Sequence, residues 1–342
     1  MCDAFSCTRK KKSLGTKKVT LKTDAAAVVC APGNAGMFDG ETTTFRFGFG
    51  DAETGSETAA GKGTTTAAFG ADVATENDFA GNCAPAEEID GDSVRTADDV
   101  TWNGTYLTFG SIEIVRGDYG STAGTLEGCP EESDLVPRVY EGGLKVWEGA
   151  NDLAALIAER GLGSDVDGME DVHVLELGAG HAVPGLVAAR KFAGRCRALT
   201  LTDYNRDVVE EVTVPNAQTT LLLMENDGER VPDKVRYLSG DWSGYSAFVD
   251  AGDVDVLLTS ESIYDVSQYQ SLCAFISHAL SARGVCYVAA KSYYFGVGGG
   301  TSAFTTFCEK CFDLTVDKVE TVSDGKSNVR EILLVRKKQK TT

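Results

Sequence analysis

The sequence predicts an α/β protein in which a mostly parallel sheet is covered by helices on both faces. Between residues 172 and 312, short apolar runs alternate with longer amphipathic segments, which is the rhythm of strands that each lead into a helix. The strand-like runs are continuously apolar, as expected for strands buried on both faces. A glycine turn directly after the first run, Gly178-Ala179-Gly180, forms a nucleotide-sized pocket at the end of that strand.

The elements of this unit follow one another in a regular order. We predict strands at Val172–Leu177, Ala198–Thr202, Val235–Leu238, Val254–Thr259 and Val285–Ala290, and helices at Pro184–Phe192, Arg206–Leu223, Ser267–Ala282 and Phe304–Phe312. Two later strand-like runs, Phe312–Val319 and Val329–Val335, are separated only by a short turn, so they are predicted to form an antiparallel hairpin that closes the sheet. A parallel sheet that ends in such a hairpin is typical of seven-strand methyltransferases and not of the plain dinucleotide-binding fold.

The chain before this unit has a different composition. Residues 1–98 are rich in Thr, Ala, Gly and Asp, and because they hold few large apolar residues we predict that most of this acidic extension is disordered. Its basic cluster at Arg9–Lys12 is either a nuclear import signal or a solvated tail. Its aromatic segment Thr44–Phe49 is either a short strand or a docking motif.

The ordered domain is predicted at residues 99–342, with its core at residues 134–336. Within it, Thr105–Val115 has strand character and a helix is expected to begin near Asn151. No apolar run is long enough for a transmembrane helix, and the first residues lack the apolar core of a signal peptide. Ten scattered cysteines then indicate reduced thiols, so we expect the protein in the cytoplasm and in the nucleus or nucleolus.

The formal net charge of −19 restricts the partners of the chain. Acidic residues gather in residues 51–100, which disfavours nucleic acid and favours a basic protein partner, although an acidic solvated linker explains the same residues. We expect no direct DNA binding, no membrane association and a monomer. Cys308 and Cys311 form the only close CxxC pair, and because no histidine or second pair is near in the sequence we expect no metal site.

The residues around the glycine turn indicate which nucleotide is bound. A dinucleotide fingerprint needs its third glycine three residues after Gly180, and that position is Val183. An acid two residues before Gly178, here Glu176, is instead the pattern of enzymes that use S-adenosylmethionine (SAM). Glu176 is expected to accept a hydrogen bond from the methionine ammonium, directly or through water.

The later strand ends add further polar residues, because ligands of such sheets lie beyond the carboxyl ends of the strands. Asp203 follows the second strand and is expected to bind both ribose hydroxyls, with an N-cap role as the alternative. After the third strand, Asp241 is expected to accept from the adenine amino group, while Trp242 either stacks on the ring or is a core residue. The reactive methyl is expected beyond the fourth strand, where Glu261 and Tyr264 are the catalytic candidates. After the fifth strand, the glycine-rich segment 291–301 is predicted to be a mobile aromatic lip over the acceptor pocket.

Several segments together resemble a known family: DLVPRVYEGGLKVWEGAND, LELGAGHAVPG, TDYNRDVVEEVTVPN, GDWSGY, DVLLTSESIYD and AKSYYFGVGGGTSAF. They closely resemble eukaryotic protein-histidine methyltransferases, which use SAM to modify one histidine of the L-three protein of the large ribosomal subunit. The resemblance covers roughly residues 134–336 and implies a class I, seven-β-strand, Rossmann-like SAM-dependent methyltransferase. It implies cofactor contacts from Val146, Trp147, Glu148, Gly149, Ala150, Gly178, Asp203, Tyr204, Asn205, Gly240, Asp241, Trp242 and Ser260.

Two departures from related patterns are informative. Lysine methyltransferases of the wider group carry Asp-x-x-Tyr after the fourth strand, whereas this chain has Glu261-Ser262-Ile263-Tyr264, which favours the histidine branch. His181 and Ala182 stand where small residues are expected after the glycine turn, so the shape of that loop is left open.

The expected reaction is transfer of a methyl group to the tele nitrogen of a histidine, the choice of nitrogen resting on the resemblance alone. An imidazole is mostly neutral at pH 7, whereas a lysine must first lose a proton at a cost of roughly 4.6 kcal/mol. We expect Glu261 or a neighbouring strand-end carbonyl to hold the distal ring N–H, with Tyr264 and Tyr294 as walls of the acceptor pocket. The alternatives are a lysine methyltransferase that acts on another protein and a SAM-binding scaffold for ribosome assembly.

Overall fold

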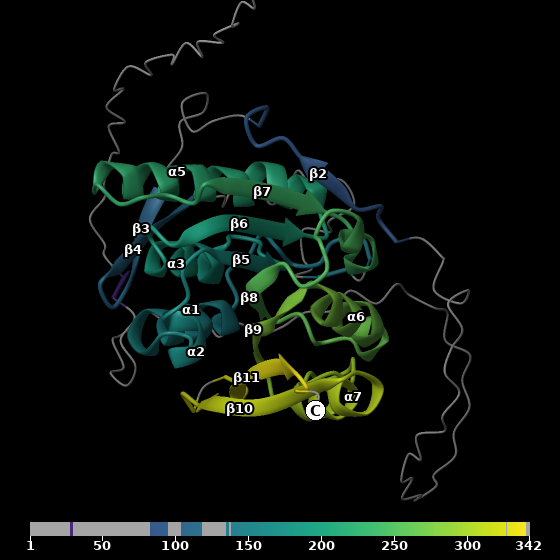
Figure 1. Cartoon of the computed structure of the whole chain (residues 1–342). Coiled ribbons are helices and arrows are strands. Elements are labelled where there is room, and N and C mark those ends of the chain that lie inside the picture. The colour runs from purple at the N-terminus through teal and green to yellow at the C-terminus, as the bar shows by residue number, and fades with distance from the viewer. Residues whose placement is uncertain are drawn as a thin grey trace, which may run out of the picture.

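The computed structural model describes residues 28–29, 83–94, 104–117, 135–136, 138–325 and 327–339. Their main feature is an eight-stranded sheet with the order β10-β11-β9-β8-β5-β6-β7-β2 (Figure 1). Its strands are β2 (Glu87–Ile89), β5 (Val172–Leu177), β6 (Cys196–Asp203), β7 (Lys234–Ser239), β8 (Val254–Ser260), β9 (Leu280–Lys291), β10 (Leu314–Val322) and β11 (Arg330–Lys337).

The pairing of these strands confirms the predicted topology. β5 lies between β6 and β8, and the ladders β6–β7, β5–β6, β5–β8 and β8–β9 are all parallel. β11 pairs antiparallel with both β9 and β10, which is the predicted closing hairpin. The chain moves from β5 outward to β7 and then returns to β8 on the other side of β5. The carboxyl ends of β5 and β8 therefore border a switch point, where such sheets bind ligands.

Helices cover both faces of the sheet, because successive strand residues point to opposite sides. Val174 and Leu199 pack with α1 (Glu148–Arg160), α3 (Val183–Lys191) and α5 (Val214–Asn226). Leu175 and Val288 pack with α6 (Tyr269–Ala279) and α7 (Thr301–Cys311) on the other face. The short elements are α2 (Ser164–Asp167), α4 (Arg206–Val208), η2 (Val209–Thr213), η3 (Trp242–Ala247) and η4 (Val266–Gln268). No helix in the described part of the chain is both long and apolar enough to cross a membrane.

Several element boundaries differ from the predictions, and the predicted helix Arg206–Leu223 is divided into α4, η2 and α5. The segment Thr105–Val115 is not one strand but the hairpin of β3 (Gly104–Phe109) and β4 (Ile112–Gly117), because Gly110 and Ser111 form a tight turn. This hairpin and β1 (Val28–Val29) form a separate three-stranded sheet. The helix expected near Asn151 begins at Glu148, and α6 ends at Ala279 because the next three residues already belong to β9.

An unpredicted strand joins the sheet from the segment assigned to the extension. β2 pairs antiparallel with β7, and Ile89 is buried there with Tyr237 in the core. Arg236 binds the Glu88 carboxylate with its Nε at 2.7 Å. Residues 83–94 thus pack with the folded domain, although they precede the predicted boundary at residue 98. The basic cluster Arg9–Lys12 and the aromatic segment Thr44–Phe49 lie outside the described residues.

The role of β2 leads to a stability prediction. Ile89→Ala should lower the free energy of unfolding by about 2–4 kcal/mol, because it removes a buried aliphatic side chain from the core. Glu88→Gln, which alters the neighbouring half-exposed ion pair, should cost less than about 1 kcal/mol. Urea unfolding of both variants beside the wild type measures the difference. Equal midpoints for Ile89→Ala and the wild type would show that residues 83–94 are not part of the cooperative fold.

Candidate active site

A cleft of about 920 Å³, solvent at its mouth included, lies beyond the carboxyl ends of β5, β6, β7 and β8. In Figure 1 the arrowheads of β6 and β7 point to this edge of the sheet. Predicted site residues that line the cleft are Val146, Trp147, Ala150, Gly178, Gly180, Asp203, Tyr204, Asp241, Trp242, Ser260, Glu261, Tyr264 and Tyr294. Predicted residues outside the lining are Glu148, Gly149, Glu176, Asn205 and Gly240. Lining residues that were not predicted are Leu135, Glu141, Gly142, Gly143, Lys145, Ala179, His181, Val183, Ser262 and Gln268.

The glycine turn forms an open cradle between β5 and α3. Gly178 has a φ of +62°, and no atom lies within 4 Å of the position that a Cβ would take there. A side chain at this position would be strained and would project into the cleft. The neighbouring Ala179 N–H donates to the Thr202 carbonyl at 2.7 Å, which holds the turn against β6. The turn therefore leaves its backbone accessible to a ligand.

Asp203 connects the end of β6 to this turn. One carboxylate oxygen, Oδ2, accepts from the Gly180 N–H at 2.9 Å, and Oδ1 accepts from the Asn205 N–H at 3.2 Å. Burial raises the pKa of Asp203 to about 6. The first helical residue after β6 is Arg206 and its N-cap is Asn205, so Asp203 is not the helix cap that the sequence left as an alternative. Asp203 is a buried acid at the cleft wall.

Glu176 lies behind the glycine turn rather than in the cleft. Its side chain is fully buried, and Oε2 accepts from the Gly185 N–H of α3 at 2.8 Å. Burial raises the pKa of this carboxyl well above its usual value. Its carboxylate faces the first turn of α3 and so helps to fix the angle at which α3 leaves the turn. Its contact with a methionine ammonium, directly or through water, stays a prediction.

Asp241 and Trp242 lie together at the end of the cleft that follows β7. The Asp241 side chain caps η3, since its Oδ1 accepts from the Ser243 N–H at 2.9 Å. Its backbone N–H donates to the Ala84 carbonyl at 3.0 Å, which brings the segment before β2 to this end of the cleft. Trp242 is half-buried and lines the cleft, so it is not an enclosed core residue. Gly240 packs under Pro85 and is covered.

The segment before α1 forms the opposite wall of the cleft. Asn205 positions it, accepting from the Glu141 N–H at 2.9 Å and donating to the Val139 carbonyl at 2.7 Å. Trp147 Nε1 donates to the Gly142 carbonyl at 3.0 Å. His181 holds the same segment through an Nε2 contact with the Leu144 carbonyl at 2.9 Å, and burial lowers the pKa of His181 to about 4. Asn205 and His181 are therefore supports of the loop.

Glu261 lies at the end of β8 in an unusual backbone conformation. Its φ of +55° is left-handed, which is uncommon for a residue with a side chain and is often found at functional sites. Its Oε2 accepts from the Tyr294 hydroxyl, and its backbone N–H donates to the Ala289 carbonyl at 2.8 Å. A Cβ at Gly149 would lie 2.8 Å from Oε1, so the glycine lets the carboxylate approach the start of α1.

A second tyrosine–carboxylate pair lies beside the first. The Tyr264 hydroxyl donates to Glu141 Oε2, while Glu141 Oε1 accepts from the Arg138 N–H at 2.6 Å. Burial is the main reason that the pKa of Glu141 rises to about 7. The Tyr264 and Tyr294 rings meet edge to face, with centroids 6.4 Å apart. Sequence reasoning missed Glu141, although an acid directly before two glycines in VYEGG was a visible signal.

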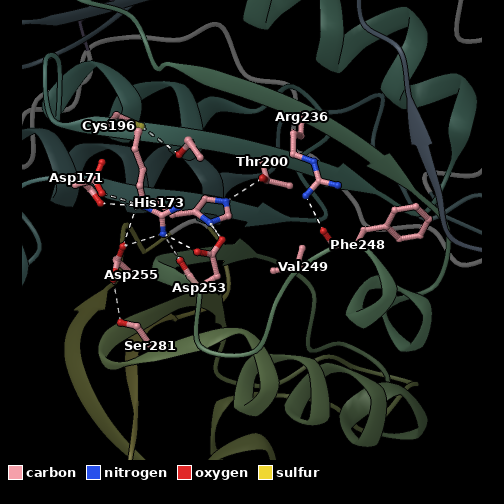
Figure 2. Close-up of polar contacts among 12 residues, drawn as sticks. Asp171, His173, Cys196, Thr200, Arg236, Phe248, Val249, Asp253, Asp255 and Ser281 are labelled. Atoms are coloured by element: carbon pink, nitrogen blue, oxygen red, sulfur yellow. Dashed lines mark hydrogen bonds and ion pairs between the residues drawn. The ribbon is translucent and has the colours of Figure 1, made fainter.

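The three histidines of the chain occupy separate elements, as the sequence indicated. Figure 2 shows His173 between Thr200 and Asp253, near the amino ends of the strands. Its Nδ1 lies 2.9 Å from Asp253 Oδ2 and its Nε2 lies 2.9 Å from Thr200 Oγ1. Arg197 also binds Asp253, at 2.9 Å. This network links strands at the end of the sheet opposite to the cleft, so His173 is a structural residue.

Comparisons with known proteins agree with this geometry. A family model described as lysine methyltransferase matches residues 138–296. The histidine protein methyltransferase 1 homolog of Dictyostelium discoideum is 35% identical over 208 residues, which are 61% of this chain and 62% of that protein. The mouse homolog is 32% identical over an alignment of 212 residues, and the match covers 56% of each chain. The chain thus spans less than two thirds of these two relatives.

The relative in Schizosaccharomyces pombe is covered more fully. Histidine protein methyltransferase 1 of that yeast is 31% identical over an alignment of 238 residues, and the match covers 60% of this chain and 68% of the yeast protein. The strand order of the sheet, without β2, is that of the predicted seven-strand methyltransferase class. The chain therefore belongs to the family of histidine protein methyltransferase 1 and its homologues.

Proposed function

We propose that this protein is a SAM-dependent protein-histidine N-methyltransferase. The observation that carries the proposal is one continuous cleft with two chemically different ends. One end has the open Gly178 cradle and the buried acid Asp203, and the other has two tyrosine–carboxylate pairs. The first end suits a nucleoside with an amino-acid tail, and the second suits a small polar ring. Membership of the family supports the same reading.

The residues present fit SAM. Gly178 leaves space at the turn, Asp203 offers a carboxylate at the position for ribose hydroxyls, and Trp242 offers an aromatic surface at the end beyond β7. The Asp241 carboxylate lies at the same end, where its Oδ1 accepts a hydrogen bond from the Ser243 N–H and its Oδ2 can accept one from a ligand. When bound, SAM supplies an electrophilic methyl group whose bond to sulfur breaks as the new bond to nitrogen forms. The chain supplies binding, orientation and exclusion of water.

The residues at the other end suit a neutral acceptor. Tyr264 and Tyr294 are buried and their rings meet edge to face, so they can form two walls of a pocket for a flat ring. An imidazole needs no strong base, because its lone pair is available once the ring is neutral. The site therefore has to orient the ring and select its tautomer. Glu261 holds the Tyr294 hydroxyl, which fixes one of the two walls.

We place the acceptor in a basic protein of the large ribosomal subunit, of the L-three type, and at the tele nitrogen of one histidine. The net charge of −19 supports a basic partner. The same proposal places the monomeric enzyme in the cytoplasm and in the nucleus or nucleolus, where ribosomal proteins are made and assembled.

A lysine acceptor is the second candidate, because the matching family model is described as lysine methyltransferase. Such an acceptor has to be deprotonated in the cleft, at a cost of roughly 4.6 kcal/mol at pH 7. Glu141, whose pKa lies at about 7, is an acid of suitable strength at that end, so the choice has to be made by experiment.

Amino-acid analysis separates the two candidates. The protein should transfer label from radioactive SAM to a ribosomal extract from cells that lack it, and hydrolysis should release labelled methylhistidine, mainly the tele isomer. An Asp203→Ala variant treated in the same way is the control. Labelled methyllysine would favour the second candidate, and no label at all would favour the non-enzymatic scaffold.

Asp203 also allows a direct test of the cofactor end. Asp203→Ala should weaken SAM binding by about 10- to 100-fold, because it removes a buried charged hydrogen-bonding group from the cleft wall. Asp207→Ala is the matched control, since Asp207 is an exposed acid four residues further along that does not line the cleft. Calorimetric titration measures both. If the two variants bound SAM with equal affinity, Asp203 would not be a ribose-binding residue.

A further inference from the structure

Two carboxylates lie at the acceptor end of the cleft, and their surroundings differ. Glu261 is only 9% exposed, and burial raises its pKa although the nearby Lys291 ammonium and the Gly149 N–H at the start of α1 act in the opposite direction. Glu141 is half-buried and lines the cleft. Glu261 lines the cleft as well, but Glu141 is the more exposed of the two carboxylates. Glu141 is therefore the one that a substrate ring reaches more easily, whereas Glu261 holds the Tyr294 hydroxyl.

Glu141 is also held in a defined orientation. The Arg138 N–H fixes Oε1 at 2.6 Å, and the Tyr264 hydroxyl fixes Oε2. Gln268 Nε2 approaches the same hydroxyl at 3.4 Å. A carboxylate has about four acceptor positions, and these two donors occupy two of them. The remaining positions can accept a further N–H.

The charges around Glu141 come from three segments. Asp203 at the end of β6 and Asp265 before η4 are acidic and raise its pKa, whereas Arg138 on its own loop lowers it. Tyr264 faces it from the segment after β8, and Tyr204 faces it from the end of β6. Burial has the largest effect and brings the pKa to about 7. Glu141 is thus an acceptor whose strength matches an imidazole, and not a permanently charged surface acid.

We propose that Glu141 accepts the hydrogen bond from one ring N–H of the substrate histidine, so that the other ring nitrogen faces the methyl donor. This inference rests on the proposed function and moves the role first considered for Glu261 to Glu141. Tyr264 is then a positioning residue for Glu141, as Glu261 is for Tyr294.

The proton balance follows from this arrangement. The lone pair of the facing nitrogen forms the new bond to carbon, and the donor sulfur keeps the electron pair of the bond that breaks. The methylated ring carries one positive charge until its remaining N–H loses a proton. Glu141 takes up that proton and passes it to water at the mouth of the cleft, which returns the carboxylate to its starting state.

The test measures initial rates of methyl transfer by Glu141→Gln and by the wild type. The substrate is ribosomal extract from cells that lack the protein, used at low concentration. At pH 8, the variant should be slower by about 10- to 100-fold, because a charged hydrogen-bond acceptor is lost. Its SAM affinity by calorimetry should stay within about twofold of the wild type, since only the acceptor end changes. Glu320→Gln, which alters an exposed ion pair with Arg160, is the control.

The pH dependence separates this role from a structural one. SAM is kept saturating, so that titration of Asp203 does not limit cofactor binding. Below about pH 6, the logarithm of the wild-type rate should then fall with a slope near two, because both Glu141 and the free substrate imidazole must be deprotonated. Glu141→Gln should show a slope near one. The product should remain the tele isomer, since an amide that donates to the pros nitrogen leaves an N–H and no lone pair facing the methyl donor, which lowers the rate without changing the product.

Tyr264→Phe covers the case in which Glu141→Gln is poorly folded. It removes the hydroxyl that holds Glu141 and keeps the ring wall, so the rate should fall by about 3- to 10-fold with the slope near two retained. A Glu141→Gln rate within twofold of wild type, an unchanged slope, or a loss matched by lost SAM affinity would overturn the inference while the proposed function stands. If the wild type itself forms no methylhistidine, the proposed function fails and the inference fails with it.

Discussion

The buried carboxylate of Asp203 is the interaction on which the site depends. It accepts from the Gly180 N–H of the glycine turn and from the Asn205 N–H at the start of the next helix. Asn205 in turn holds the Glu141 segment, so the turn, the end of β6 and the loop before α1 form one connected frame. Parallel pairing of β5 and β6 brings these groups to the same edge of the sheet. The frame forms from backbone donors, and a ligand can then bind without the loop first having to order.

The acceptor end is built on the same plan of paired donors and acceptors. The Tyr264 hydroxyl donates a hydrogen bond to Glu141, and the Tyr294 hydroxyl donates one to Glu261. The two tyrosine rings meet edge to face. Burial raises the pKa of both carboxylates, and both line the cleft. Glu261 is the more buried of the two and has the Lys291 ammonium nearby, whereas Glu141 is the more exposed. One pair can therefore serve mainly as structure while the other remains available to a substrate.

Local patterns in the sequence were sufficient for the sheet and for much of the cleft. Continuous apolar runs located β5 and β8 well, and reading the strand ends placed Asp203, Glu261 and Tyr264 beside the cleft. The orientation of a strand-end side chain was less predictable, since Glu176 points behind the turn that it precedes. The short strand β2 was missed because its partner β7 is far along the chain and a three-residue strand has no periodicity to detect. Glu141 was missed for a similar reason: its meeting with Tyr264 spans 123 positions of sequence.

The central claim is that this cleft methylates histidine in a protein. The most direct measurement is fragment-ion mass spectrometry of the L-three-type protein of the large ribosomal subunit, purified from cells with and without this chain. The account predicts a mass increase of one methyl group on a single histidine, present only when the chain is active and lost with Asp203→Ala. An unmodified histidine in both samples, or a methyl group confined to lysine, would contradict it.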